Sequence, residues 1–317
     1  MVLNKLKKNF PDQQFLLKSI DNVTEIRSDA SNRVYYRLHS NQKTYIFMDS
    51  SEEKESFINF LKIARILKEK NINVPDIFCC NEKEGLAIIS DLGSDSFVEI
   101  INNENSNVII KKLIDFLILM QTNVKSPLIS SYTYEILEKE IRLFDRWYLK
   151  EHLKIKLNSN TFQSLSRLYE KIILNMQNQS KVFTHRDFML RNLMSNNLNI
   201  GLIDFQDAKI GPYTYDFVSL IKDTNFSWND NKINHFISYY FEKKIPSLHI
   251  ESKEDLISDF YHTAIQRHLK VLGIFARLYY RDGKKKYLIN EESRFRNYLK
   301  SSILILDEFK PILTLIS

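Results

Sequence analysis

The feature that most constrains this sequence is a set of two carboxylates and one amide arranged around a short hairpin. Asp187 comes first, Asn192 follows it, and Asp204 stands after two short apolar runs at 193–194 and 200–203. The polar turn between those runs predicts a β-hairpin, which would return Asp204 to the side of Asn192. The sequence therefore predicts that an amide and a carboxylate oxygen meet at one end of this hairpin.

These side chains suit phosphoryl transfer. One carboxylate must orient the attacking hydroxyl and accept its proton, while an amide oxygen and a second carboxylate must hold the magnesium ion on the nucleotide phosphates. Residues 185–192 read His-Arg-Asp-x-x-x-x-Asn, the pattern of a kinase catalytic loop. We therefore predict Asp187 as the catalytic base, Asn192 and Asp204 as Mg²⁺ ligands, and ATP as the phosphate donor.

Composition narrows the class of protein further. The 317 residues suffice for one large domain or two lobes, and 44% hydrophobic with 26% charged residues is ordinary for a soluble globular chain. No apolar signal segment or membrane span is expected, and the adjacent Cys79 and Cys80 make a poor disulfide, so a cytoplasmic location is predicted. The net charge of +6 suits an anionic ligand such as ATP.

The predicted elements are strand-rich at first and helix-rich afterwards. After N-terminal helices ending at 21–22, strands are expected at 23–26, 34–38, 44–48, 74–78 and 85–89, with one helix at 52–71. Further helices are expected at 107–122, 134–152, 161–178, 215–222, 231–241, 253–278 and 291–309. This order predicts an α+β, two-lobed, protein-kinase-like fold. A small antiparallel β-sheet N-lobe with one helix would span 1–92, with a hinge at about 89–93. A larger, mainly helical C-lobe would span 93–317.

With lobes, hinge, catalytic loop and metal Asp in this order, the chain resembles the aminoglycoside phosphotransferase family of kinase-like small-molecule kinases. A narrower likeness lies in residues 204–208, 211–212, 215–220, 48–49 with 53–55, and 267–278. These stretches are similar to the anomeric N-acetylmuramate/N-acetylglucosamine kinases of bacterial cell-wall recycling. That resemblance implies ATP-dependent transfer of phosphate to the C1 hydroxyl of an N-acetylated amino sugar.

Two segments are candidates for nucleotide binding. Ser31 and Asn32 lie between two predicted strands and could cover the phosphates with backbone N–H groups, although an ordinary hairpin turn fits equally well. The family resemblance makes Ser90, Asp91 and Leu92 the hinge that would contact adenine through backbone groups.

The third predicted strand departs from the usual pattern. Kinase-like folds place a Lys there to hold the nucleotide phosphates, paired to a helix Glu, but this chain has Met48. Arg33 or Arg37 on the preceding strand could supply the positive charge, because a guanidinium binds phosphate in a bidentate fashion. Glu53 or Glu55 could orient whichever cation is used, and a solvated surface position fits each of these charges as well.

Acceptor residues are suggested mainly by the resemblance. Arg267, His268 and Lys270 fall on one predicted helix and could meet a lactyl carboxylate, or they could be surface charges. Trp147 could stack on a sugar ring or belong to the core. Arg191 could contact a substrate phosphate or form a salt bridge within the loop.

Two further loop residues are expected to be structural. His185 would pack and hydrogen-bond, since Asp187 already serves as base, and Asp216 would anchor the catalytic loop through backbone N–H groups.

Other functions remain open at this stage. Another small-molecule kinase of the same fold could act on an aminoglycoside, choline or a different sugar. A catalytically silent nucleotide-binding regulator would explain Met48, but the intact Asp187, Asn192 and Asp204 argue against it. No aromatic and basic RNA-reading motif is visible, so no nucleic-acid partner is expected.

A monomer with ATP and an amino sugar as its only partners is predicted.

Overall fold

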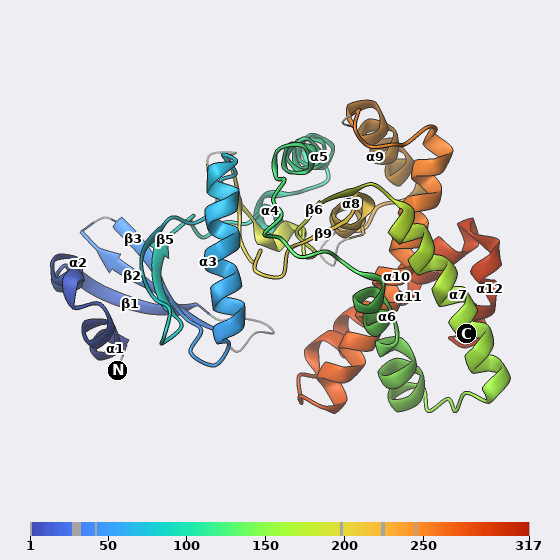
Figure 1. Cartoon of the computed structure of the whole chain (residues 1–317), viewed down its shortest axis with the longest axis horizontal. Helices are drawn as coiled ribbons and strands as arrows, with labels where there is room; N and C mark the ends of the chain where they lie inside the picture. Colours follow the sequence, from blue (N-terminus) through green and yellow to red (C-terminus); the bar gives the residue numbers. More distant parts are fainter. Residues whose placement is uncertain are drawn as a thin grey trace. The chain divides into compact units, whose positions relative to one another are not determined.

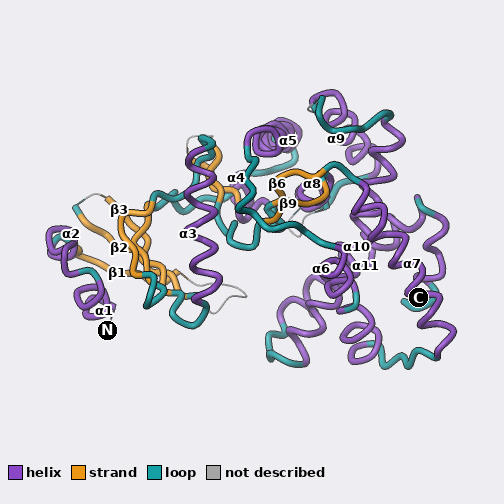
Figure 2. The backbone as a smooth tube through the Cα atoms, viewed as in Figure 1, coloured by secondary structure: helices purple, strands orange, loops and turns teal. Residues whose placement is uncertain are grey.

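The computed structural model describes residues 2–26, 33–41, 43–196, 199–222, 226–244 and 246–316. The chain forms two compact units. The first contains residues 1–102 and 190–208, and the second contains residues 103–189 and 209–317. The sequence indicates one boundary near residue 92, with the hairpin in the later lobe. In the structure the segment 190–208 instead belongs to the first, strand-rich unit, while the second is mainly helical (Figure 2).

The first unit is built on a five-stranded antiparallel sheet with the strand order β1-β2-β3-β5-β4. Its strands are β1 (Ile20–Ile26), β2 (Val34–Ser40), β3 (Lys43–Asp49), β4 (Ile77–Asn81) and β5 (Leu86–Ser90). Four of the predicted strands are confirmed, and the fifth is displaced, because β4 begins at Ile77 and not at residue 74. The N-terminal helices end earlier than predicted, because β1 already begins at Ile20 and pairs with β2 there.

Helices cover both faces of this sheet (Figure 1). On one face lie α1 (Val2–Asn9), η1 (Pro11–Gln13) and α2 (Gln14–Lys18), and on the other lies α3 (Lys54–Glu69). Leu38, Phe47 and Ile88 form one core cluster with residues of α1 and α2. Since side chains alternate along a strand, the buried Ile46 and Met48 point to the opposite face, toward α3.

A short hairpin completes the first unit. It consists of β7 (Leu193–Asn196) and β8 (Asn199–Leu202), preceded by η3 (Leu190–Asn192) and accompanied by α4 (Phe97–Ile100). The N–H of Leu202 donates to the carbonyl of Asn73 at 2.8 Å, and Phe205 stacks on Phe60 of α3 at 5.1 Å. A Cβ on Gly201 would lie 2.8 Å from a methyl group of Leu92, so a larger residue at this position would require the Leu92 side chain to shift.

The second unit is a helical assembly with one two-stranded ribbon, β6 (Lys181–Thr184) paired with β9 (Lys209–Pro212). Its helices are α5 (Ser106–Asn123), α6 (Tyr134–Ile141), η2 (Phe144–His152), α7 (Ser159–Asn178), α8 (Thr214–Ile221), α9 (Asp230–Lys243), α10 (Lys253–Tyr280), α11 (Lys286–Ile305), η4 (Asp307–Phe309) and α12 (Lys310–Leu313). The continuous helix predicted over 134–152 is wrong in detail, because α6 gives way to the π-helical η2.

This change of helix type occurs where α10 crosses. A Cβ added to Gly273 would lie 2.4 Å from the carbonyl carbon of Leu143 and 2.6 Å from the backbone nitrogen of Phe144. The backbone of α10 therefore contacts the backbone of the α6–η2 junction, and a glycine is required at the crossing point.

Gly273→Ala is accordingly expected to destabilise the protein, although alanine favours helices. The clash is with backbone atoms that cannot rotate away, and such overpacking costs about 1–3 kcal/mol or more. Urea unfolding followed by circular dichroism should show a lower midpoint with an unchanged slope. A midpoint equal to or above that of the wild type would contradict this packing.

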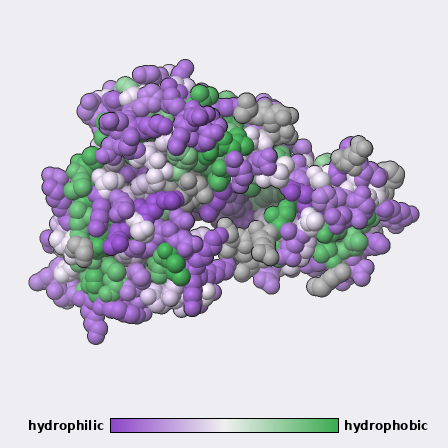
Figure 3. All heavy atoms as spheres, turned by 180° about the vertical axis from the view of Figure 1, so that it is seen from behind, coloured by the Kyte–Doolittle hydropathy of each residue, from purple (hydrophilic) through white to green (hydrophobic). Residues whose placement is uncertain are grey.

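The face of the molecule seen in Figure 3 is predominantly hydrophilic, with hydrophobic residues in separate patches. Among the helices of the described residues, none combines the length and the apolar character needed to cross a membrane.

Candidate active site

The hairpin of the first unit places the backbone of Asn192 beside the segment that leads to Asp204, and these are the two predicted metal ligands. The N–H of Ile203 donates to the carbonyl of Asn192 at 3.1 Å, so the segment that bears Asp204 runs beside Asn192. The Asn192 side chain is buried, whereas that of Asp204 is 43% exposed. Asp204 has a positive φ of 65°, a conformation that non-glycine residues adopt rarely and that recurs at active sites.

The chemistry of this pair fits a magnesium ion. Amide and carboxylate oxygens are the hard donors that Mg²⁺ accepts, usually together with water and substrate phosphates. One Asp204 oxygen accepts a hydrogen bond from the side-chain amide of Gln206 at 2.9 Å, which fixes the carboxylate in the strained turn.

The cations predicted for phosphate binding are placed differently. Arg33 is 6% exposed, and its guanidinium contacts Glu53 at 3.2 Å and Asp204 at 3.9 Å. Arg37 donates twice to Asp91, at 2.6 and 3.1 Å, and also to the carbonyl of Gly93. Arg37 therefore fixes the predicted hinge.

The partner of Arg33 on the helix is Glu53 at the N-cap of α3, whereas the exposed Glu55 has no such contact in the described structure. Of the two predicted candidates, Glu53 is therefore the one that borders the buried guanidinium, and a role of Glu55 in nucleotide binding stays a prediction. Ser31 and Asn32 lie outside the described residues.

The predicted hinge residues are held by their side chains. The Ser90 hydroxyl accepts from the N–H of Asp76 at 2.8 Å, Asp91 pairs with Arg37, and Leu92 packs against Gly201. Adenine contact by the backbone of this segment stays a prediction.

In the second unit, the catalytic loop follows directly after β6 and is anchored by Asp216 of α8. The two carboxylate oxygens of Asp216 accept hydrogen bonds from the backbone N–H groups of His185, at 2.5 Å, and Arg186, at 2.9 Å. The predicted anchoring role of Asp216 is thus confirmed. Nδ1 of the buried His185 lies 3.2 Å from the N–H of Asp187, as a hydrogen-bonding role for that ring requires.

Burial raises the pKa of Asp216 from 3.8 to about 6, although the bonds from His185 and Arg186 act in the opposite direction. The carboxyl group of Asp216 therefore loses its proton at a lower pH in the unfolded chain than in the folded chain. Ionisation of this carboxyl group destabilises the folded state. The contribution of this group to stability is full below pH 3.8 and is lost as the pH rises through about 6.

Unfolding free energy should consequently show a pH dependence that Asp216→Asn removes. Relative to that variant, the wild type should lose about 3 kcal/mol as the group titrates, at 1.36 kcal/mol per pKa unit. Urea unfolding of both proteins at several pH values measures the difference. Parallel stability curves for the two proteins would show that Asp216 does not titrate as expected.

A buried charge cluster, which sequence reasoning missed, surrounds the loop. Glu140 of α6 pairs with Arg186 and, at 3.0 Å, with Lys270, and it accepts a hydrogen bond from Tyr132. Lys270 also donates to the hydroxyl of Tyr215 at 3.1 Å. Glu140 lies on the stripe of α6 that carries the buried Leu137 and Ile141, and a carboxylate within an apolar stripe is a signal that could have identified it.

Arg267 of α10 contacts the loop backbone itself. Its guanidinium donates to the carbonyl of Arg186 at 3.1 Å and approaches the sulfur of Met189 at 3.4 Å. Arg267 and Lys270 are buried, so they are not the surface charges that the sequence left possible. They hold the catalytic loop, and their contact with an acceptor stays a prediction.

The other predicted acceptor residues lie elsewhere. His268 is fully buried, with its ring 5.7 Å from that of Phe295 and 5.6 Å from that of Tyr298, and burial lowers its pKa well below 6.5. This packing separates His268 from the Arg267 and Lys270 cluster, because it lies on another face of α10. Trp147 is half-buried against the aromatic core, and Arg191 is exposed in η3.

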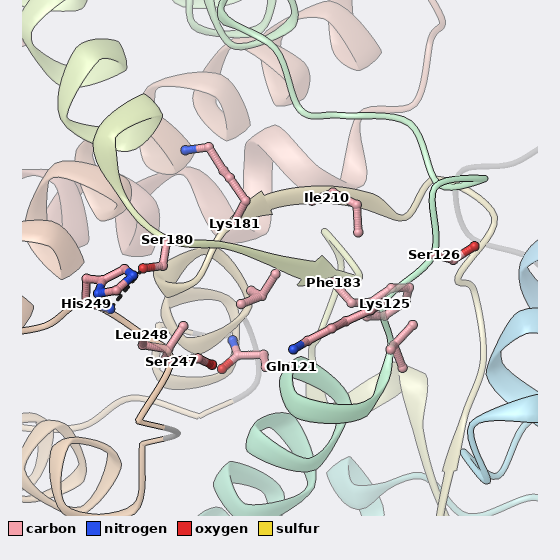
Figure 4. Close-up of a pocket in the computed structure, with 12 residues that line it drawn as sticks. Gln121, Lys125, Ser126, Ser180, Lys181, Phe183, Ile210, Ser247, Leu248 and His249 are labelled. Carbon is pink, nitrogen blue, oxygen red and sulfur yellow. Dashed lines mark hydrogen bonds between the residues drawn. The ribbon is translucent and has the colours of Figure 1, made fainter.

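A separate cavity of about 450 Å³ lies in the second unit (Figure 4). It is bordered by the end of α5, by β6 and β9, and by residues 247–249, and none of the predicted site residues lines it. Lys181 points away from the neighbouring side chains and donates to three carbonyls at the end of α7. The cavity borders the start of β6, whereas the catalytic loop follows the C-terminal end of this strand.

The fold is that of kinase-like small-molecule phosphotransferases. The structure superimposes with a TM-score of 0.68 on a choline kinase from Streptococcus pneumoniae at 13% identity, over 95% of this chain and 99% of that one. An ADP-bound aminoglycoside phosphotransferase gives a TM-score of 0.64 at 14% identity, over 95% and 98% of the two chains. The predicted protein-kinase-like fold is thus confirmed.

Sequence comparison places the chain in a family. Residues 22–245 match the model of the phosphotransferase enzyme family. A protein of Pseudomonas aeruginosa named N-acetylmuramate/N-acetylglucosamine kinase is 34% identical over 87% of this chain and 82% of its own. A protein of Neisseria meningitidis with the same name is 32% identical over 99% and 93%. This chain belongs to the phosphotransferase enzyme family, and the resemblance seen in its sequence is confirmed.

Proposed function

We propose that this chain is an ATP- and Mg²⁺-dependent kinase that phosphorylates the anomeric C1 hydroxyl of N-acetylmuramate, N-acetylglucosamine or both, in peptidoglycan recycling. The observation that carries the proposal is the identity of 32–34% over most of the chain to relatives named for these two sugars. A cytoplasmic, monomeric enzyme is part of the same proposal.

The proposed chemistry assigns one task to each loop residue. Asp187 orients the sugar hydroxyl and accepts its proton while the oxygen attacks the γ-phosphorus and the bond to the β-phosphate oxygen breaks. Asn192 and Asp204 would hold Mg²⁺, which supplies charge neutralisation on the phosphates when bound. Asp216, Arg267 and Glu140 keep the loop in place, since positioning provides much of the rate in phosphoryl transfer.

The support from the residues is specific. Asp216 accepts from the backbone N–H groups of both His185 and Arg186, and the hairpin places Asn192 beside the segment that leads to Asp204. The positive φ of Asp204 supports a functional carboxylate at this position, since such conformations recur at active sites.

An acceptor panel tests the proposal. Purified protein with ATP and Mg²⁺ is offered N-acetylmuramate, N-acetylglucosamine, choline and kanamycin, and ADP release is followed. ADP release with one or both amino sugars, and with neither of the other acceptors, is expected. Turnover on choline or kanamycin alone would refute the proposed substrate, and nucleotide binding without turnover on any acceptor would favour a silent regulator.

A further inference from the structure

The third strand of the first unit lacks the usual phosphate-binding cation. Met48 of β3 is fully buried and pairs across the sheet with Tyr35 of β2 and Ala87 of β5. A thioether cannot neutralise phosphate charge. If the chain binds ATP, another cation must reach the same face of the sheet.

The alternation of side chains decides which face each candidate occupies. Phe47 and Leu38 pack toward α1 and α2, so Tyr35, Arg37 and Met48 face α3. Lys43 has the same parity as Phe47 along β3 and therefore points to the wrong face. It is also exposed, at the end of the hairpin that joins β2 and β3.

Arg37 faces the right way, but its guanidinium is already committed. It makes a bidentate pair with Asp91, whose side chain is 4% exposed, and a third bond to the Gly93 carbonyl. Moving Arg37 to a phosphate would leave the Asp91 carboxylate buried without its partner, which is strongly unfavourable.

Arg33 remains, and its surroundings match those of a phosphate-binding cation. Its guanidinium donates to Glu53 at 3.2 Å and to the hydroxyl of Tyr35 at 3.3 Å, and it lies 3.9 Å from Asp204. Asp204 is the proposed metal ligand, so the guanidinium is next to the place where the β- and γ-phosphates would be bound.

We propose that Arg33 is the cation that replaces the third-strand lysine, with Glu53 and Tyr35 as the residues that position it. Tyr35 is opposite Met48 in the sheet, so its hydroxyl brings the guanidinium to the strand position that lacks a charge. Holding the guanidinium in one orientation before ATP binds reduces the entropy lost on binding. This inference rests on the proposed ATP-dependent function.

Nucleotide affinity tests the inference without reference to turnover. Calorimetric titration with ATP and AMP in Mg²⁺ compares the wild type with Arg33→Met, Arg33→Lys and Tyr35→Phe. Arg33→Met should weaken ATP binding about 30-fold, as expected for a lost hydrogen bond to a charged group, and should change AMP binding about twofold or less. Arg33→Lys should retain part of the affinity, and Tyr35→Phe should cause a smaller loss for ATP alone.

A second-site rescue makes the test sharper. Adding Met48→Lys to Arg33→Met restores a cation at the usual strand position and should recover part of the lost ATP affinity. Lys43→Met is the matched control, because it removes the same charge from the other face of the sheet and should leave ATP affinity unchanged.

The outcomes separate the two proposals. Equal affinities for ATP in wild type and Arg33→Met, or equal losses for ATP and AMP in a folded variant, would overturn the role of Arg33. If the wild type binds ATP but phosphorylates no amino sugar, the proposed function is refuted. The comparison of ATP affinities between the variants still decides the role of Arg33. A wild type that binds no nucleotide would contradict both.

Discussion

Asp187→Asn is expected to reduce kcat by a factor of about 10³, within the range of 10²–10⁴ that positioned acid–base groups contribute. Asparagine has nearly the same shape but cannot accept the proton of the sugar hydroxyl. ATP affinity should change little, because this side chain is assigned to the acceptor and not to the nucleotide. Single-turnover phosphoryl transfer, measured together with ATP titration, separates the two effects.

The control for this variant is the integrity of the loop. The hydrogen bonds from His185 and Arg186 to Asp216 involve backbone N–H groups that the substitution leaves unchanged. The unfolding midpoint should therefore remain near that of the wild type. A variant with wild-type kcat would show that Asp187 is not the base and would remove the basis of the proposed chemistry.

Glu140→Gln should have the largest effect on stability. The carboxylate neutralises both Arg186 and Lys270, whose side chains are only 13% and 11% exposed. Removing one member of a buried charge cluster typically costs about 3–5 kcal/mol, because the remaining charges stay buried without their partner. Urea unfolding should show this loss, and kcat should fall because Arg186 directly precedes Asp187.

Glu138→Gln is the matched control on the same helix. Glu138 is 42% exposed, and its contact with Arg142 is 3.7 Å long. Its replacement should change the unfolding free energy by about 0.5 kcal/mol or less. The Glu140→Gln/Lys270→Met double variant should be less destabilised than the sum of its single variants. Equal effects of the Glu138 and Glu140 substitutions would contradict the structural importance of the cluster.

Local patterns in the sequence predicted the succession of strands along the chain and the hairpin well. Alternating residues define β2 and β3, and the polar turn after Met194 defines the hairpin that returns to Ile203. These features depend on near neighbours, since the most distant pair in these two hairpins, Val34 and Asp49, is 15 positions apart. The anchoring role of Asp216 was predicted from its place after the metal segment, and the structure adds that the residue is buried and accepts from His185 and Arg186.

Contacts between residues far apart in the sequence were harder to predict. Glu140 meets Lys270 across 130 positions, and nothing in either neighbourhood marks them as partners. The pairing of β6 with β9 was missed because each strand is only four residues long. Assignment of the hairpin to the first unit depends on Phe60 and Asn73, which contact it across more than 120 positions.

In the segment 267–278, the regular spacing of residues has a structural cause that differs from the functional surface it suggests. Arg267, Lys270 and Gly273 recur every three residues along α10, which suggests one functional surface. In the structure Arg267 holds the catalytic loop, Lys270 pairs with Glu140, and Gly273 admits the backbone of the α6–η2 junction. The spacing therefore reflects the packing of α10 against the catalytic loop and the neighbouring helix.

The site of phosphorylation tests the central claim most directly. Phosphorus NMR of the product from N-acetylglucosamine is compared with a reaction on its methyl glycoside, in which the C1 oxygen is blocked and all other hydroxyls are free. We predict a C1 phosphate from the free sugar, no product from the glycoside, and loss of the C1 phosphate signal in Asp187→Asn. A phosphate on any other hydroxyl, or turnover of the methyl glycoside, would contradict the assignment of this chain as an anomeric kinase.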